Sequence, residues 1–146
     1  MQVFQRLHPG YGIAVVRIMA GIVLFVAGYQ KLMGPGVAGI TGFFASVGIP
    51  AAPVMAPLLI AFEIIGGLLL IAGAFSRFVG MAMIVQFLVA GFLVSLPSQM
   101  GWGMARMDFL MLACGVMFVL SGAGLLSVDA WLAARGGGRT RATAFA

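Results

Sequence analysis

Charged side chains are scarce in this sequence. Its 146 residues include 8 Lys and Arg and 3 Asp and Glu, so charged residues make up 8% of the chain while hydrophobic residues make up 63%. A water-soluble domain carries about 25% charged residues. The mean hydropathy of +1.18 agrees with this deficit. The composition excludes a soluble globular protein and predicts an integral membrane protein surrounded by the lipid bilayer.

Cysteine and histidine are equally rare. The one cysteine, Cys114, lies in an apolar run, so an intrachain disulfide and a CxxC redox pair are excluded. The one histidine, His8, precedes the first apolar run, and no metal or haem site built from His and Cys ligands is expected. Basic residues stand singly, which excludes a nucleic-acid binding patch. The chain is therefore expected to hold no cofactor of its own.

Four apolar runs are long enough to cross a bilayer, which takes about 20 helical residues. The predicted spans are Gly12 to Leu32, Val54 to Phe75, Phe78 to Leu96 and Asp108 to Leu126. The second span is expected to carry Pro57 in its first turn. A connection rich in Gly and Pro separates the first two spans, and within it Val37 to Val47 are predicted to form a short interfacial helix.

The predicted fold is an all-α membrane protein, a four-transmembrane-helix bundle with a short interfacial helix or loop between its first two spans. Residues 1–134 are expected to form a single transmembrane domain, and residues 135–146 a flexible basic tail. Three further apolar segments follow the first span, which is therefore expected to be retained rather than cleaved as a signal peptide.

The distribution of basic residues predicts the orientation, because cytoplasmic loops are enriched in Lys and Arg. With four spans, both termini and the connection between the second and third spans share one side of the membrane. That side carries five basic residues, Arg6, Arg77, Arg135, Arg139 and Arg141, and the opposite side carries Lys31 and Arg106. Both termini are therefore predicted to be cytoplasmic, in the plasma (inner) membrane of a bacterium.

Three polar residues lie inside the predicted spans. A charged side chain at the centre of a membrane helix costs about 2.5–3.5 kcal/mol on insertion scales. Depths calculated from the helical rise put Arg17, Glu63 and Gln86 in one band in the inner half of the bilayer. In a structural interpretation Arg17 pairs with Glu63 or reaches the inner surface. In a functional interpretation Glu63 holds or relays a proton beside an apolar, quinone-like or thiol-linked ligand.

A second polar set lies at the predicted outer face. Tyr29, Gln30 and Lys31 end the first span, and Arg106 and Asp108 begin the fourth. Lys31 and Asp108 are expected at equal depth, where an interfacial ion pair is one interpretation. Simple anchoring of helix ends at the membrane surface is another. The third interpretation is the mouth of a binding site covered by the Gly-rich connection.

Four segments follow one another in order over nearly the whole chain: VVRIMAGIVLFVAGYQKLMG, GFFASVGIP, EIIGGLLLIAGAFSR and GAGLLSVDAWLAAR. Together they resemble the DoxX family of small four-helix membrane proteins. The chain departs from the family pattern at three positions. Family members often have histidine where this chain has Ala27 and Ser95, and glutamate where it has Asp108. Chemistry that requires those histidines is not expected here.

The resemblance implies a membrane subunit linked to redox metabolism, through thiosulfate oxidation coupled to quinone or through complexes that handle thiols and oxidative stress. A soluble or peripheral oxidoreductase is then the expected partner, and a quinone the expected ligand, with Arg17, Glu63 and Gln86 lining its site. Two alternatives stay open. One is a small-molecule carrier or permease, which with four spans is expected to be a homodimer. The other is a structural assembly factor without chemistry.

Overall fold

The computed structural model describes residues 9–99, 101–124, 127–129, 131 and 135. The helices in this part of the chain are α1 (Pro9–Met33), α2 (Gly36–Ser46), α3 (Ala52–Ala72), α4 (Ser76–Val89), the π-helix η2 (Ala90–Ser95) and α5 (Trp102–Ser121). Four helical segments are long and apolar enough to cross a membrane, namely α1, α3, α4 together with η2, and α5. The predicted all-α bundle with four membrane spans is confirmed.

Three predicted boundaries are wrong. The fourth span begins at Trp102, six residues before Asp108, so Asp108 lies within the helix rather than at its start. The only charged side chain in this extra length, Arg106, is exposed and does not interrupt the helix. The fourth span ends at Ser121, five residues before the predicted Leu126, because Gly122 terminates the helix. The second span begins at Ala52, which places Pro57 inside α3 and not in its first turn. Of the predicted tail, residues 136–146 lie outside the described residues.

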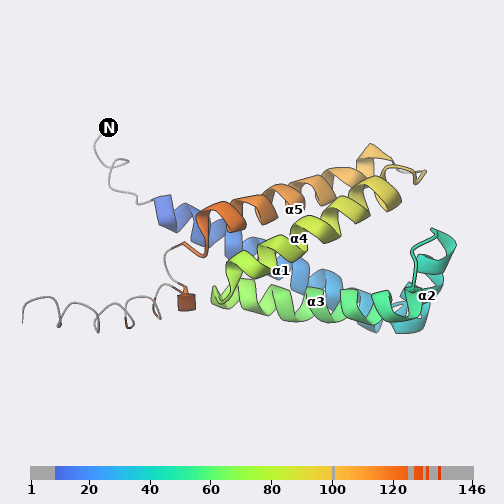
Figure 1. The fold of residues 1–146 in the computed structure, drawn as a ribbon, viewed down its shortest axis with the longest axis horizontal. Helices are drawn as coiled ribbons and strands as arrows, with labels where there is room; N and C mark the ends of the chain where they lie inside the picture. The colour runs from blue at the N-terminus through green and yellow to red at the C-terminus, as the bar shows by residue number, and fades with distance from the viewer. Residues whose placement is uncertain (1–8, 100, 125–126, 130, 132–134, 136–146) are drawn as a thin grey trace, which may run out of the picture.

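The predicted interfacial helix is present as α2, and it crosses one end of the bundle (Figure 1). It follows Gly34-Pro35 and starts at Gly36, which has a φ of 65° and therefore suits a residue without a side chain. Its single buried residue, Ile40, packs against Ala56 and Ile60 of α3. This contact fixes α2 next to the N-terminal half of α3.

The spans form two closely packed pairs. A Cβ atom added to Gly67 of α3 would lie 2.6 Å from the backbone nitrogen of Phe25 and 2.7 Å from the carbonyl oxygen of Gly21, both in α1. In the other pair, a Cβ atom at Gly80 of α4 would lie 2.8 Å from the carbonyl oxygen of Gly115 in α5. Small residues thus bring the helix backbones of each pair into contact, as is common in membranes.

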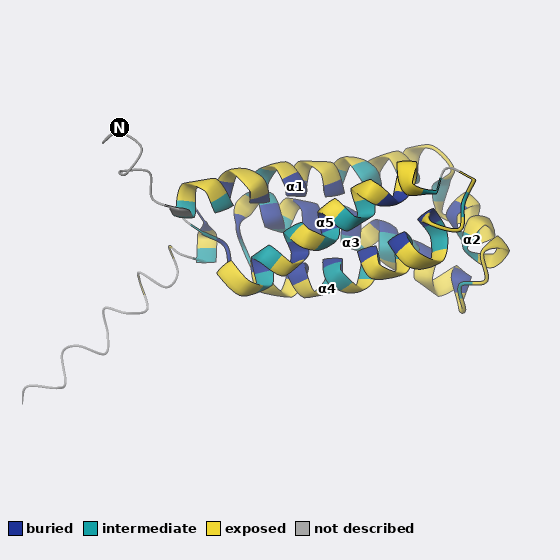
Figure 2. Cartoon of the chain, turned by 90° about the horizontal axis from the view of Figure 1, so that it is seen from above, coloured by how far each residue is buried: buried dark blue, intermediate teal, exposed yellow. Residues whose placement is uncertain are grey.

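The two pairs, α1 with α3 and α4 with α5, meet at the end of the bundle where α1 begins and α5 ends, and separate towards the end that holds α2 (Figure 1). Between them lies an apolar core with the fully buried Leu70, Met83 and Phe118 at its centre. The outward faces of the helices are exposed along their length (Figure 2). These faces are apolar, with Phe78 and Leu120 among the most exposed side chains, as expected for surfaces that contact lipid.

Candidate functional site

Glu63 is the centre of a polar group contributed by three helices. It lies on α3 and is 3% exposed. The Lys31 ammonium of α1 donates hydrogen bonds to both carboxylate oxygens, at 2.8 and 2.7 Å, and Nε2 of Gln86 on α4 donates to Oε1 at 2.8 Å. The backbones of α1 and α3 approach each other closely at Gly28, where an added Cβ atom would lie 2.8 Å from Cβ of Glu63. We call Lys31, Glu63 and Gln86 the central polar group.

The two side chains of the Lys31–Glu63 ion pair differ in how much of their surface is exposed. The Lys31 side chain is 31% exposed, whereas the Glu63 side chain is 4% exposed. Hydrogen bonds between charged partners are about twice as strong as neutral ones, which offsets part of the cost of holding a carboxylate in an apolar bundle. Within the described part of the chain, Oε1 of Gln86 is buried and has no hydrogen-bond partner. The central polar group therefore retains an unused acceptor.

The central polar group faces a cavity of about 740 Å³. The cavity occupies the half of the bundle next to α2. Its lining residues start at Val23 in α1 and at Ala82 in α4, and they extend no further than Glu63 in α3 and Met111 in α5. Its volume is within the range of small-molecule sites, about 300–1,000 Å³. Most of the lining is apolar, including Leu24, Ala27, Phe43, Phe44, Leu59, Val85 and Phe87.

A second polar pair lines the same cavity. Ser95, the last residue of η2, is 3% exposed, and its hydroxyl donates a hydrogen bond to the Asp108 carboxylate on α5. The backbone nitrogen of Leu96 bonds to the carbonyl oxygen of Gly91 at 2.9 Å, a π-helical bond that places an additional residue in this turn. Such π-helical turns occur frequently at functional sites. Asp108 is also close enough to interact electrostatically with Glu63.

The predicted outer-face set is divided by the structure. Lys31 and Asp108 both line the cavity, but they do not pair with each other, because Lys31 binds Glu63 and Asp108 binds Ser95. Tyr29 and Gln30 lie on the exposed face of α1, outside the cavity. Helical geometry explains the division, since positions 24, 27 and 31 share one face of α1 and positions 29 and 30 do not.

The predicted grouping of Arg17 with Glu63 and Gln86 is wrong. Arg17 precedes Gly28, the neighbour of Glu63, by 11 residues, or about 16 Å along the helix axis. Arg17 is fully buried near the end of the bundle where α1 begins and α5 ends, and its guanidinium donates a hydrogen bond to the carbonyl oxygen of Ala123. Depth calculated from residue number assumed that the helix ends are level, but Glu63, the twelfth residue of α3, lies beside Gly28, which is only the sixth residue from the end of α1.

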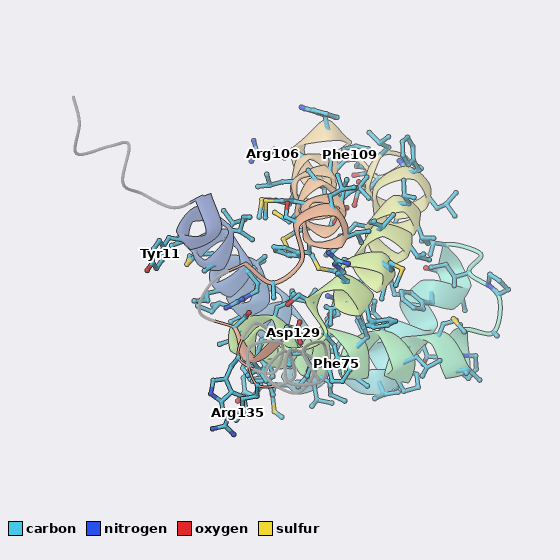
Figure 3. The ribbon with its side chains drawn as sticks, turned by 60° about the vertical axis from the view of Figure 1, so that its left-hand side comes forward. Tyr11, Phe75, Arg106, Phe109, Asp129 and Arg135 are labelled. Atoms are coloured by element: carbon cyan, nitrogen blue, oxygen red, sulfur yellow. The ribbon has the colours of Figure 1, made fainter. Side chains whose placement is uncertain are left out.

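Arg17 belongs instead to a structural clamp at the end of the bundle where α1 begins and α5 ends. Asp129 accepts hydrogen bonds from the backbone N–H groups of Phe75 and Ser76, at 3.0 and 3.3 Å, and its own N–H donates to the carbonyl oxygen of Gly73 at 3.1 Å. Asp129 and Phe75 appear next to each other in Figure 3. Arg17 interacts electrostatically with Asp129. The clamp ties the segment after α5 to the turn between α3 and α4.

Sequence reasoning missed the role of Ser95, although a signal for it existed. The three positions at which the chain departs from the DoxX pattern, Ala27, Ser95 and Asp108, all line the cavity. The three departures thus fall in one place in the structure, which would have marked Ser95 as a candidate. Among the described residues, no group of three or more His, Cys, Asp and Glu side chains is arranged to hold a metal ion.

Comparison with known proteins agrees with this architecture. The sequence model of the DoxX family matches residues 12–96. A Bacillus subtilis (strain 168) protein named "Putative oxidoreductase CatD" is 33% identical over 118 residues, which cover 81% of this chain and 84% of the relative. No solved structure matches. The family match covers more than half of the sequence and includes three of the four membrane spans, and we conclude that this chain belongs to the DoxX family.

Proposed function

We propose that this protein is the membrane-embedded, ligand-binding subunit of a redox system, and that its cavity binds an apolar molecule with a polar head, such as a quinone. The observation that carries the proposal is the position of the central polar group, which faces an otherwise apolar cavity of about 740 Å³ inside the bundle. The name of the Bacillus subtilis relative, an oxidoreductase, supports the redox assignment.

The chemistry of the central polar group suits the head of such a ligand. Lys31 and Gln86 carry N–H donors beyond those that bind Glu63, and Oε1 of Gln86 is an unused acceptor. A quinone supplies a site that takes up two electrons and two protons. The protein would bind and orient the head of the ring, exclude lipid from it, and hold a proton-exchanging carboxyl, Glu63, within reach.

The apolar lining suits the body of the ligand. Leu24, Leu59, Val85 and Phe87 contribute apolar surface from three different helices. Burial of such surface favours binding by about 25 cal/mol per Å² removed from water. The chain has one Cys and one His, so we propose that electrons come from a carrier bound to a soluble or peripheral oxidoreductase partner.

The orientation is part of the proposal. The basic residues near the termini favour a cytoplasmic location for that end of the bundle, with the protein in the plasma (inner) membrane of a bacterium. The cavity then lies in the half of the membrane away from the cytoplasm, and the clamp formed by Arg17 and Asp129 lies on the cytoplasmic side.

The test is purification of the tagged, full-length protein from native membranes in a mild detergent. Proteins and lipid-soluble molecules that co-purify are identified by mass spectrometry, for the wild type, Glu63→Gln and Gln30→Ala. Gln30 lies on the exposed face of α1 beside Lys31 and is the control. We expect quinone with the wild type and Gln30→Ala, and at least tenfold less with Glu63→Gln.

A soluble oxidoreductase is expected to co-purify with all three proteins. Absence of quinone from all three would refute the ligand assignment. Recovery of a different apolar molecule without any partner protein would refute the redox assignment and favour a carrier.

A further inference from the structure

The pair formed by Ser95 and Asp108 has no part in the ion pair at Glu63, yet it lines the same cavity. Glu63 and Lys31 belong to the α1–α3 pair of helices, whereas Gln86, Ser95 and Asp108 belong to the side formed by α4, η2 and α5, and the hydrogen bond from Gln86 to Glu63 joins the two sides. The two helix pairs separate at this end of the bundle (Figure 1). The cavity between them therefore has polar groups on both walls and apolar residues between.

The hydrogen bond between Ser95 and Asp108 determines what this pair of side chains can offer a ligand. The Ser95 hydroxyl has one proton, and it is donated to Asp108. An ionised carboxylate only accepts, with about four lone-pair sites on its two oxygens. The pair is therefore an acceptor, which binds an O–H or N–H group and rejects a carbonyl. Among the described residues no cation forms an ion pair with Asp108.

The central polar group also has acceptors to spare. Oε1 of Gln86 is buried without a partner in the described part of the chain, and Oε2 of Glu63 accepts one hydrogen bond, from Lys31. Leaving a buried acceptor unsatisfied is unfavourable, so a ligand that donates both to the central polar group and to Asp108 gains more than one that donates to a single one of them.

We propose that the cavity binds its ligand at two points and selects an apolar ring with hydrogen-bond donors at two opposite edges, as in an alkylated 1,4-hydroquinone. One hydroxyl donates to the central polar group and the other to Asp108, which Ser95 holds in place. The inference rests on the proposed function and narrows it, because it favours the dihydroxy form of a quinone-like ligand over the dicarbonyl form.

The test measures binding by calorimetry to the full-length protein in detergent under reducing conditions. The probes are decyl-1,4-hydroquinone and its monomethyl ether, which has nearly the same size and one donor fewer. We expect the wild type to bind the hydroquinone about ten- to a hundredfold more tightly, the range for one hydrogen bond to a charged group. In Asp108→Asn the acceptor becomes an uncharged amide oxygen, so the preference for the hydroquinone over the ether should fall to a few-fold.

Two further variants keep the test independent of folding. Ser95→Ala, a small change, should weaken hydroquinone binding severalfold and leave ether binding unchanged. Ser98→Ala is its matched control, since the Ser98 hydroxyl donates to the carbonyl oxygen of Ser95 and does not line the cavity. It should leave both affinities unchanged.

Equal binding of the two probes by the wild type would overturn the two-point inference. So would unchanged hydroquinone affinity in both Asp108→Asn and Ser95→Ala while Glu63→Gln weakens it, because the ligand would then be held at the central polar group alone. In that case the proposed function survives. Absence of binding by every probe, including the oxidised decyl-1,4-benzoquinone, would refute the proposed function itself.

Discussion

Removing Lys31 should destabilise the protein more than removing the charge of Glu63. The two side chains form one ion pair, but the Glu63 side chain is 4% exposed and the Lys31 side chain is 31% exposed. In Lys31→Met the carboxylate stays in its apolar surroundings with Gln86 as its remaining hydrogen-bond donor. In Glu63→Gln the lysine is free to extend its ammonium group towards the membrane surface.

The magnitudes follow from this asymmetry. Loss of one partner from a buried ion pair costs about 3–5 kcal/mol. Because Lys31 is partly exposed, we expect the lower part of this range or less, about 2–3 kcal/mol, for Lys31→Met. Glu63→Gln leaves a partly exposed charge and should cost about 1 kcal/mol. The double variant should be no less stable than Lys31→Met, with a coupling energy of about 1–2 kcal/mol.

The assay is equilibrium unfolding in mixed detergent micelles of the wild type, both single variants and the double variant. Arg106→Met is the matched control, because Arg106 is exposed at the same end of the bundle, and it should change stability by less than about 0.5 kcal/mol. A larger loss in Glu63→Gln than in Lys31→Met would refute the reasoning. Additive effects in the double variant would show that the two residues do not interact.

Three further predictions concern packing, capping and orientation. Gly67→Val should destabilise the protein by about 1–3 kcal/mol in the same unfolding assay, because its Cβ atom would lie within 2.7 Å of two backbone atoms of α1, whereas Gly12→Ala, in open space, should be neutral. Asp129→Ala should cost about 1–2 kcal/mol, since two backbone N–H groups at the start of α4 lose their acceptor, without changing ligand binding per folded molecule. In a cysteine-free background, Ser46→Cys should react with a membrane-impermeant maleimide in intact spheroplasts, and Arg135→Cys only after lysis; the reverse pattern would invert the proposed topology.

The number and type of the helices could be predicted from the sequence because a bilayer imposes two simple requirements. Each span needs about 20 apolar residues, and every backbone polar group must be satisfied within the helix. The short helix α2 was readable for a related reason, since Gly and Pro bracket it on both sides. Helix ends were less predictable. Trp102 and Arg106 lie before the predicted start of the fourth span at Asp108 but belong to α5, because an exposed charge near a helix end is tolerated.

The sequence predicted several residues of the candidate site but not all of their partners. Glu63, Gln86, Lys31 and Asp108 were singled out because polar residues in apolar runs are rare, and all four line the cavity. Glu63 and Gln86 were grouped together and are hydrogen-bonded, but Glu63 was given Arg17 as its ionic partner instead of Lys31. Residue number alone does not say how far one helix is shifted along its axis relative to its neighbour, and Arg17 lies towards the opposite end of the bundle.

The sequence by itself determined that this chain is a four-span helical membrane protein, because composition and run length alone set that outcome. It also determined which few polar residues required a structural or functional reason. The tertiary structure alone decided that Lys31 binds Glu63, close to the point where α1 and α3 approach each other at Gly28. It also decided that Ser95 donates a hydrogen bond to Asp108 at the π-helical turn, and that both pairs of side chains line one cavity. These contacts depend on backbone approach and helix rotation, which arise from the packing of all the helices together.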